Sequence, residues 1–230
     1  MVPDAPGANV RQVIFLLLLL LLLCVGVRAD RIVLVTGFEP FDGRTRNVSW
    51  DAVRAMDGVR VGDARVRVLR LPVVWEATRE RIERAVRDPD DSVVLLVGFG
   101  EGRPDRIAIE RTAHNRADTA SRDVRGRRAP RARFVAGGAE RFESALGVER
   151  LRGILARSGF EAEVSDDAGS FLCEEAYYHL ADLAPTAPDG RRRALFVHLP
   201  PYPEGDTGGA HLARMRRAVR LVVDAASLER

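Results

Sequence analysis

Short apolar runs, each bounded by glycine, proline or charged residues, recur along the sequence and predict buried β-strands. Segments with an apolar residue at every third or fourth position lie between them and predict amphipathic helices. We expect strands over residues 31–36, 64–74, 91–97, 106–110, 161–164 and 194–199, and helices over 50–56, 75–86, 148–157, 171–183 and about 208–228. This alternation predicts an α/β fold, a three-layer α/β/α sandwich with a mostly parallel mixed sheet.

The N-terminal segment has a different pattern from the rest of the chain. Residues 13–27 are almost wholly apolar, follow a basic residue and end in a small-residue site at Ala29. This pattern is typical of a secretory signal peptide, and the run is short for a membrane span, which makes an uncleaved membrane anchor the second choice. The leucines before Cys24 do not suit a lipidation site. We therefore expect a signal peptide over 1–29 and export of the protein. Residues 30–230 have the length of a single domain of ordinary size.

The charge balance bears on possible partners. All 36 basic residues are arginine, against 33 acidic ones, so the formal net charge is only +3. Residues 115–138 have no apolar periodicity, are rich in arginine and predict a long, mobile loop. A nucleic-acid surface usually interleaves aromatic residues with its basic ones, whereas Phe134 stands alone in this stretch. We expect no nucleic-acid partner and no membrane contact beyond the signal segment.

A cysteine at the start of a predicted helix is the first candidate for chemistry. The stretch Ser165–Cys173 leads from a short strand through small residues into that helix. The free N–H groups and the helix dipole at such a position favour a thiolate over a thiol. Cys173 is the only cysteine outside the N-terminal segment, so it has no disulfide partner within 30–230. A lone cysteine is about as often a small buried apolar residue, and a nucleophile needs a base.

His198 and Glu110 are the candidates to complete a catalytic triad. His198 lies near the end of a predicted buried strand that a proline-rich exit follows, and Glu110 ends another strand. Structural alternatives remain, namely a buried histidine bonded to backbone and a surface carboxylate. If the three residues converge, His198 takes the thiol proton, Glu110 orients the imidazole, and Cys173 attacks a carbonyl. The histidines and cysteines lack metal-ligand spacing, so we expect no metal and no cofactor.

Two glycine-containing segments follow predicted strands. Residues Gly37–Gly43 carry Phe38 and Phe41 at a strand's C-terminal end, the usual ligand position in open α/β folds, although both rings could simply cap the core. Residues Gly98–Arg103 predict a glycine-rich turn. That turn lacks the Lys-Ser/Thr ending of a phosphate loop and is weak support for one.

Four motifs in this order resemble the cysteine-type pyroglutamyl peptidases, the pyroglutamyl-peptidase I family, over essentially all of residues 31–228. The motifs are Val35-Thr-Gly-Phe-Glu-Pro-Phe-Asp-Gly43, Glu110-Arg-Thr-Ala-His-Asn115 with Asp118, Ser165-Asp-Asp-Ala-Gly-Ser-Phe-Leu-Cys173, and Phe196-Val-His-Leu-Pro200. The resemblance implies a phosphorylase/hydrolase-like α/β/α fold and N-terminally pyroglutamylated peptides as substrates. By analogy with prokaryotic members, it also implies a possible homo-oligomer.

The resemblance also implies roles for individual residues. Cys173 would be the nucleophile, His198 the general base and Glu110 the orienting acid, with hydrolysis passing through a thioester acyl-enzyme. Phe38 and Phe41 would sandwich the lactam ring, because a neutral, compact lactam suits an apolar slot. A charged free N-terminus would lose its hydration in such a slot.

The sequence departs from the family pattern in three ways, one of which is that the arginine-rich loop lacks the family's usual Pro-Asp-Asn turn. Ala120 stands where the family usually has an arginine near the oxyanion site, so Arg122, Arg103 or backbone N–H groups would have to stabilise that charge. Family members are typically cytosolic, whereas this chain has the pattern of a signal peptide. Two alternative functions remain: a non-catalytic or weakly active homologue that binds lactams or pyroglutamyl peptides, and a hydrolase of another small amide.

Overall fold

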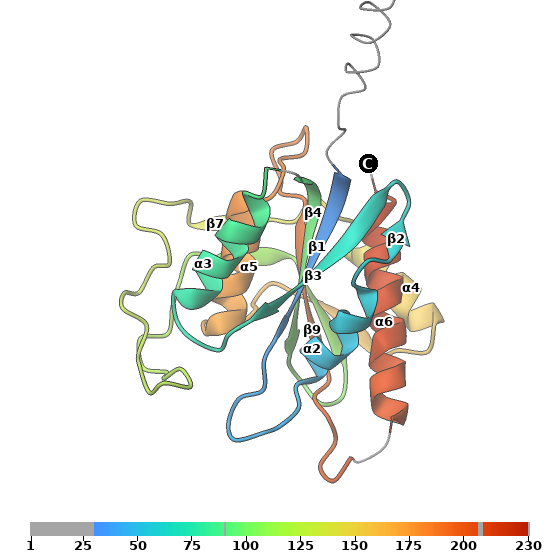
Figure 1. Cartoon of the computed structure of the whole chain (residues 1–230), viewed down its shortest axis with the longest axis horizontal. Coiled ribbons are helices and arrows are strands. Elements are labelled where there is room, and N and C mark those ends of the chain that lie inside the picture. The colour runs from blue at the N-terminus through green and yellow to red at the C-terminus, as the bar shows by residue number, and fades with distance from the viewer. Residues whose placement is uncertain (1–29, 90, 207–208, 230) are drawn as a thin grey trace, which may run out of the picture.

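A seven-stranded sheet runs through the centre of the molecule, with helices on both of its faces (Figure 1). The computed structural model describes residues 30–89, 91–206 and 209–229. The predicted signal peptide over 1–29 lies outside the described residues. Within them, no helix has the length and apolar character needed to cross a membrane.

The elements alternate along the chain as expected. The strands are β1 (Asp30–Phe38), β2 (Arg60–Val61), β3 (Ala64–Leu71), β4 (Asp91–Glu101), β5 (Ile107–Glu110), β6 (Thr112–His114), β7 (Arg141–Glu143), β8 (Ala162–Ser165) and β9 (Ala194–Leu199). The helices are α2 (Val48–Val53), the 3₁₀ turn η1 (Arg54–Met56), α3 (Ala77–Val86), α4 (Val148–Arg157), α5 (Leu172–Leu183) and α6 (Ala210–Ser227). The short strands β2, β6 and β7 were not predicted, because two or three residues are too few to show a period.

The main sheet has the order β2-β3-β1-β4-β9-β5-β8. The pairs β3–β1, β1–β4, β4–β9 and β5–β8 are parallel, whereas β5 runs antiparallel to β9 and β2 to β3. Helices α3 and α5 cover one face, and α2, α4 and α6 cover the other (Figure 1). The predicted three-layer sandwich with a mostly parallel mixed sheet is confirmed.

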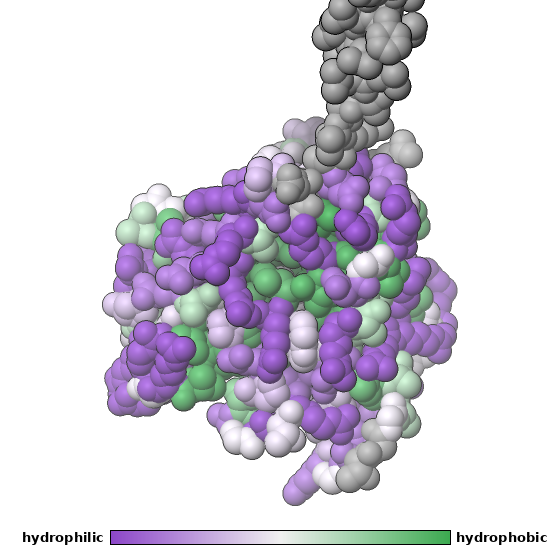
Figure 2. All heavy atoms as spheres, viewed as in Figure 1, coloured by the Kyte–Doolittle hydropathy of each residue, from purple (hydrophilic) through white to green (hydrophobic). Residues whose placement is uncertain are grey.

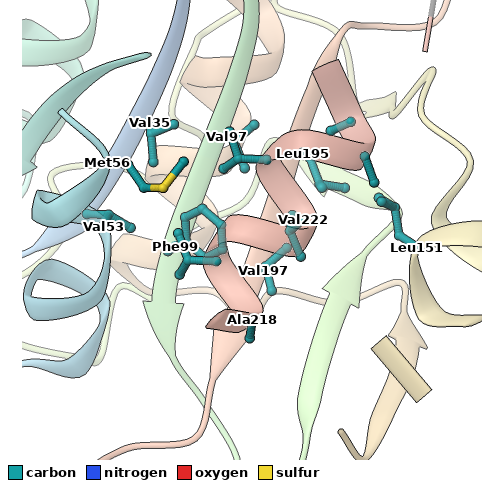
Figure 3. Packing of buried hydrophobic residues seen from close by; sticks show 14 of the residues in the cluster. Val35, Val53, Met56, Val97, Phe99, Leu151, Leu195, Val197, Ala218 and Val222 are labelled. Carbon is teal, nitrogen blue, oxygen red and sulfur yellow. The ribbon is translucent and has the colours of Figure 1, made fainter. Parts of the chain in front are cut away.

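Each face of the sheet has its own apolar core, because side chains alternate along a strand. On β1, Val33 and Val35 point to the α2/α4/α6 side, and Leu34 points to the α3/α5 side. Figure 3 shows the first of these cores, with strand side chains such as Val197 packed against Val222 of α6. The outer surface is different in character, since hydrophilic residues cover most of the face in Figure 2. The arginines of the amphipathic helices therefore lie outside and their apolar stripes inside.

The predicted glycine-rich turn over 98–103 is wrong in part, because β4 continues through it to Glu101. The glycines are strand residues that make room for neighbours. A Cβ at Gly98 would lie 2.4 Å from the Phe196 ring, closer than side chains approach in folded proteins. The segment is thus the close-packed end of a central strand, and a phosphate loop is not formed here.

The arginine-rich stretch over 115–138 is irregular, as predicted, but side chains within it attach it to the body of the protein. The Asn115 side chain donates to the Val135 carbonyl and accepts from the Val135 N–H. The buried Asp123 carboxylate accepts backbone N–H groups of Trp75, Arg125 and Arg127. An aspartate that satisfies several N–H groups in this way specifies the turn around it.

Candidate active site

The three predicted catalytic side chains meet at the edge of the sheet where the parallel strands β1, β4 and β9 end. Ligands of open α/β folds bind at this carboxyl edge. A hollow of about 600 Å³ lies elsewhere, between the starts of β1 and β4, the β2–β3 hairpin and the end of α6. It contains none of the predicted site residues.

Cys173 lies in the first turn of α5, which begins after Phe171, and its side chain is half-buried. Its sulfur is held against the end of β4. A Cβ built on Gly100 would lie 2.8 Å from the Cys173 Sγ. Glycine at position 100 is therefore needed for the thiol to lie where it does, because any other residue would bring a Cβ too close to the sulfur. The thiol faces the sheet edge with the unpaired N–H groups of the helix start beside it.

His198 lies on the buried strand β9, between β4 and β5. It pairs in register with Gly100 of β4 on one side and with Ala108 of β5 on the other. A Cβ at Gly102 would lie 2.6 Å from the His198 Cβ, so this glycine also makes room for a site residue. The imidazole and the Cys173 thiol both pack against this end of β4, the thiol against Gly100 and the imidazole against Gly102. His198 is thus placed on a rigid element, as a general base requires.

Glu110 reaches the same imidazole from β5. The antiparallel β5–β9 register pairs Glu110 with Phe196, which puts Glu110 diagonal to His198 on one face of the sheet. The His198 Nδ1 donates to Glu110 Oε1 at 2.8 Å, and the glutamate is only 1% exposed. The buried hydroxyl of Tyr177 donates to the Glu110 carbonyl at 2.9 Å and secures the end of β5.

These contacts form a continuous line of thiol, imidazole and carboxylate. With Nδ1 bonded to the carboxylate, the other ring nitrogen, Nε2, is the one left for the thiol proton. Burial alone would lower the pKa of His198, but the Cys173 thiolate and the Glu110 carboxylate outweigh it and raise that pKa to about 10. An imidazole with a raised pKa is a strong base, which is what a cysteine nucleophile requires beside it.

The remaining histidines lie outside this line. His179 is buried on α5, where burial lowers its pKa to about 4. Burial also lowers the pKa of His114, and the His211 ring contacts the Pro200 carbonyl at 3.1 Å. Among residues 30–89, 91–206 and 209–229, no group of histidine, cysteine and acidic side chains could hold a metal ion.

The two predicted pocket phenylalanines have different surroundings. Phe41 is half-buried and lines a hollow of about 230 Å³ together with Val73, Val124 and Phe171. Phe38 is 4% exposed and belongs to the apolar core beneath. The structure therefore puts Phe41 in the wall of a cavity. That Phe38 contacts the substrate stays a prediction.

Phe171 was not singled out from the sequence, although it directly precedes the helix of the candidate nucleophile. Its ring packs edge-on against Trp75, with ring centroids 5.0 Å apart, and it lines the same hollow as Phe41. The signal was available, since Phe171 belongs to the motif that ends at Cys173. Membership of a motif does not by itself show whether a residue is buried in the core or lines a cavity.

A second hollow, of about 250 Å³, opens on the other side of His198. Arg103, Glu110, Glu163 and Gly169 are among its lining residues. Because His198 and Glu110 form part of its wall, a group bound there would meet the imidazole directly. We call the hollow lined by Phe41 and Phe171 the aromatic hollow, and the one beside His198 the polar hollow. Phe171 links the aromatic hollow to the site in sequence, because it lies two residues before Cys173.

The place of the missing family arginine is taken by a tight turn. The Asp118 carboxylate accepts the Ala120 N–H at 2.7 Å, and the Asp118 N–H donates to the Ser170 carbonyl. Arg122 lines the aromatic hollow, and its guanidinium donates to the Gly126 carbonyl at 2.7 Å. Arg103 lines the polar hollow and pairs with Glu163 at 3.3 Å.

Sequence reasoning missed the part that the β4 glycines play. Gly98, Gly100 and Gly102 alternate with larger residues, so all three face α5 and the site side of the sheet. Glycines at every second position of an apolar segment were a visible signal of close approach to a strand. What they approach could not be known without the neighbouring elements.

Comparisons with known proteins agree on one family. The family model described as pyroglutamyl peptidase matches residues 31–226. The pyrrolidone-carboxylate peptidase of Cupriavidus necator is 37% identical over 174 residues, which cover 76% of this chain and 80% of that protein. The enzyme of the same name from Chromobacterium violaceum is 38% identical over 172 residues, or 75% of this chain and 79% of that one.

Solved structures show the same similarity. The pyroglutamyl peptidase I of Bacillus amyloliquefaciens superposes with a TM-score of 0.75 at 25% identity, covering 87% of this chain and 96% of the other. A mutant pyrrolidone carboxyl peptidase from Pyrococcus furiosus superposes with a TM-score of 0.74 at 26% identity, covering 86% and 99%. The similarity thus extends over nearly the whole described chain.

Proposed function

Because this chain belongs to the pyroglutamyl peptidase family, whose enzymes are cysteine-type omega peptidases, we propose that it cleaves the amide bond after an N-terminal pyroglutamyl residue with a Cys173–His198–Glu110 triad. The observation that carries the proposal is the buried imidazole of His198, which bonds to Glu110 Oε1 at 2.8 Å and lies with the Cys173 thiol at the glycine-containing end of β4. These are the contacts that a nucleophile, a base and an orienting acid require.

The proposed reaction has two stages. In acylation, His198 Nε2 takes the thiol proton, and the Cys173 sulfur attacks the pyroglutamyl carbonyl carbon. The C–N bond then breaks as the imidazolium returns its proton to the leaving amine, which leaves a thioester on Cys173. In deacylation, His198 takes a proton from water, the hydroxide attacks the thioester carbonyl, and the thiol and pyroglutamate are released. Glu110 accepts from His198 Nδ1 and holds the imidazole in the reactive tautomer.

The helix start is the proposed source of oxyanion stabilisation. Cys173 lies in the first turn of α5, where backbone N–H groups have no partner within the helix. Such groups, together with the positive end of the helix dipole, stabilise negative charge that develops on the carbonyl oxygen. This source requires no arginine at Ala120.

The aromatic hollow is the proposed lactam site. A pyroglutamyl ring is neutral and compact, so it can stack against the Phe41 and Phe171 rings, while the polar residues Asp42, Ser121, Arg122 and Asp123 in the same lining can bond its lactam amide. The leaving peptide would then extend toward the polar hollow beyond His198. In this orientation the scissile carbonyl lies between the two hollows, beside the thiol.

A turnover assay tests the proposal. The protein, in reducing buffer, is given a fluorogenic pyroglutamyl amide, with prolyl and free-glutamyl amides as controls. We expect release of the fluorophore from the pyroglutamyl amide alone, and a loss of at least about 10³-fold in both Cys173→Ala and His198→Ala. A folded protein that hydrolyses none of the three amides would overturn the proposal.

A second candidate function is binding of pyroglutamyl peptides without turnover. Ala120 favours this function, because members of the family usually carry an arginine at this position, near the oxyanion site. Without that arginine the charge of the transition state would be stabilised less well. The two functions separate in one titration of a pyroglutamyl peptide by calorimetry. A binding protein would bind the peptide unchanged, whereas a peptidase would release pyroglutamate unless Cys173 is replaced by alanine.

Export and self-association are further proposals. The apolar segment over 13–27 supports export through a signal peptide cleaved after Ala29. N-terminal sequencing of the protein from culture fluid, periplasm and membrane fractions would give Asp30 as the first residue; an intact N-terminus in the membrane fraction would identify an uncleaved anchor. Light scattering after size exclusion tests the proposed homo-oligomer.

A further inference from the structure

The loop between β1 and α2 carries Phe41 at a tight turn. Asp42 and Gly43 have φ angles of +54° and +69°, and the Arg44 N–H donates to the Phe41 carbonyl at 3.1 Å. Backbone in this left-handed region suits glycine and aspartate but does not by itself fix where the turn points. The position of the Phe41 ring therefore depends on its packing against the core on the α3/α5 side and on what else connects the turn to the rest of the protein.

The Arg44 side chain makes that connection. Its Nε donates to the Phe41 carbonyl at 3.3 Å, and its guanidinium carbon lies 4.1 Å from the centroid of the Phe41 ring. Its Nη1 donates to Glu101 Oε2 at 2.7 Å. One side chain thus stacks on the ring, closes the turn and forms an ion pair with the sheet.

Glu101 is a rigid anchor for this arginine. It is the last residue of β4, and its side chain is only 5% exposed. Its second oxygen, Oε1, accepts the N–H of Val48 at the start of α2 at 2.8 Å. In sequence it directly follows Gly100, which lies against the thiol, and it pairs with Leu199, next to His198. Glu101 therefore belongs to the same strand ends that hold the candidate nucleophile and base.

The two ends of the loop have other attachments. The Glu39 N–H donates to the Leu71 carbonyl at 3.0 Å, and the Asn47 side chain donates to the Glu39 carbonyl at 3.2 Å. Within the described part of the chain, the side-chain hydrogen bonds of residues 41–45 all come from Arg44. Loss of the Arg44–Glu101 pair would therefore release the tip of the loop while its base stays attached.

We propose that Arg44 and Glu101 are positioning residues that hold the Phe41 wall of the lactam site at a set distance from Cys173. The inference rests on the proposed function, because it assigns the aromatic hollow to the lactam. The ring of the substrate contacts Phe41 in the ground state and in the transition state alike. A displaced Phe41 therefore weakens both equally, which raises KM and leaves kcat nearly unchanged.

Two substitutions separate the contacts of this pair. In Glu101→Gln, the amide oxygen still accepts the Val48 N–H, but the amide nitrogen cannot accept from Arg44. In Arg44→Lys, a charge remains for Glu101, but the planar fork that reaches the Phe41 carbonyl is lost. Arg150→Ala is the matched control, since Arg150 forms an equally short ion pair with Glu229, at 2.7 Å, outside both hollows.

Steady-state kinetics on the pyroglutamyl amide are the main readout. We expect KM to rise about five- to tenfold in Glu101→Gln and Arg44→Ala, by a smaller factor in Arg44→Lys, and not at all in Arg150→Ala, with kcat within about twofold throughout. The double variant Arg44→Ala/Glu101→Gln should resemble Arg44→Ala alone, because the ion pair is already lost in that single variant.

Hydrogen exchange of the peptide covering residues 39–47 provides a readout that needs no substrate. Exchange should accelerate in Glu101→Gln and stay unchanged in Arg150→Ala. Unchanged exchange, an unchanged KM in a folded Glu101→Gln protein, or a fall in kcat at constant KM would each overturn the inference.

A failure of the proposed function remains distinguishable from a failure of this inference. If the unsubstituted protein binds a pyroglutamyl peptide without turnover, we would measure the dissociation constant of that peptide for each variant and compare it with the constant of the unsubstituted protein. A five- to tenfold weaker constant would then support the positioning role although the peptidase proposal has failed. Equal dissociation constants would overturn the positioning role as well.

Discussion

Gly100→Ala is the smallest change that should displace the candidate nucleophile. The added methyl group would lie 2.8 Å from the Cys173 Sγ and 3.1 Å from two atoms of the Phe196 ring. Carbon atoms rarely come closer than about 3.4 Å to such neighbours in folded proteins. Because β4 is the central strand that pairs with both β1 and β9, the backbone at Gly100 has little freedom to retreat. The thiol must therefore move.

The size of the effect follows from that distance. Relief of the contact requires the sulfur to shift by roughly 0.6 Å, from 2.8 Å to the ordinary contact distance of 3.4 Å. A misplacement of about 1 Å can cost about 100-fold in rate, so a shift of this size should cost about 10- to 100-fold in kcat, or about 1.4–2.7 kcal/mol of transition-state stabilisation. Overpacking should also reduce the free energy of unfolding by about 1–3 kcal/mol.

The assay must separate misplacement from loss of stability. We would measure kcat on the pyroglutamyl amide at saturating substrate, the rate of thiol alkylation by iodoacetamide, and thermal unfolding. Gly138→Ala is the matched control, because its methyl group would meet the Tyr178 hydroxyl oxygen at 2.7 Å, a similar overlap on the outer side of α5. The control should lose stability and keep kcat and thiol reactivity.

The reasoning would be refuted if Gly100→Ala kept the kcat and the alkylation rate of the unsubstituted protein while losing stability like Gly138→Ala. That result would mean that the thiol position is not set by β4. An equal fall of kcat in both variants would refute it as well, because the loss would then reflect general overpacking.

Three further predictions concern buried groups. Glu110→Gln should lower kcat by about 10²- to 10⁴-fold, since an amide stabilises the His198 imidazolium poorly and permits the wrong tautomer. Burial raises the pKa of Glu174 to about 8 from an ordinary value near 4.5, so the folded state keeps a proton that the unfolded chain releases, and stability falls as pH rises between those values. Glu174→Gln should remove that fall, with a gain on the order of 2 kcal/mol at pH 9 in melts from pH 4 to 9. Phe41→Ala should raise KM about tenfold with little loss of stability, whereas Phe38→Ala should cost about 3 kcal/mol in denaturant unfolding because it empties a core position.

Each of these predictions has a contrary outcome. A Glu110→Gln enzyme with nearly full kcat would show that the carboxylate does not orient the imidazole. Parallel stability profiles for Glu174→Gln and the unsubstituted protein would show that Glu174 ionises in the folded state without cost. Equal losses of stability in the two phenylalanine variants would place Phe41 in the core beside Phe38.

Much of the fold was predictable because strand and helix patterns are local. A short apolar run indicates a buried strand, and apolar residues at every third or fourth position indicate a helix with one buried face. The observed β1, β9 and α6 lie close to the ranges predicted in this way. The start of α2 is local in the same sense, because the Asn47 side chain accepts the Ser49 N–H there. The errors fell where neighbours override local signals, as in the glycine segment that forms the end of β4.

The candidate site, like the fold, was predictable from the sequence only in part. The sequence by itself determined the chemistry available: one cysteine at a helix start, a histidine and a glutamate at strand ends, and an aromatic loop after the first strand. Only the tertiary structure decided that these groups meet. Glu110 reaches His198, 88 residues away in sequence, because β5 inserts antiparallel beside β9 in one particular register.

The same holds for the spacing of the site. Gly100 of β4 and Gly102 just after it make room for Cys173 and His198, and Glu101 at the end of the strand connects through Arg44 to the Phe41 turn. Strand order and register depend on packing between segments far apart in the chain, and a periodic pattern carries no information about which strands become neighbours. The sequence therefore determines which groups can react, and the packing of the sheet determines which of them come within bonding distance.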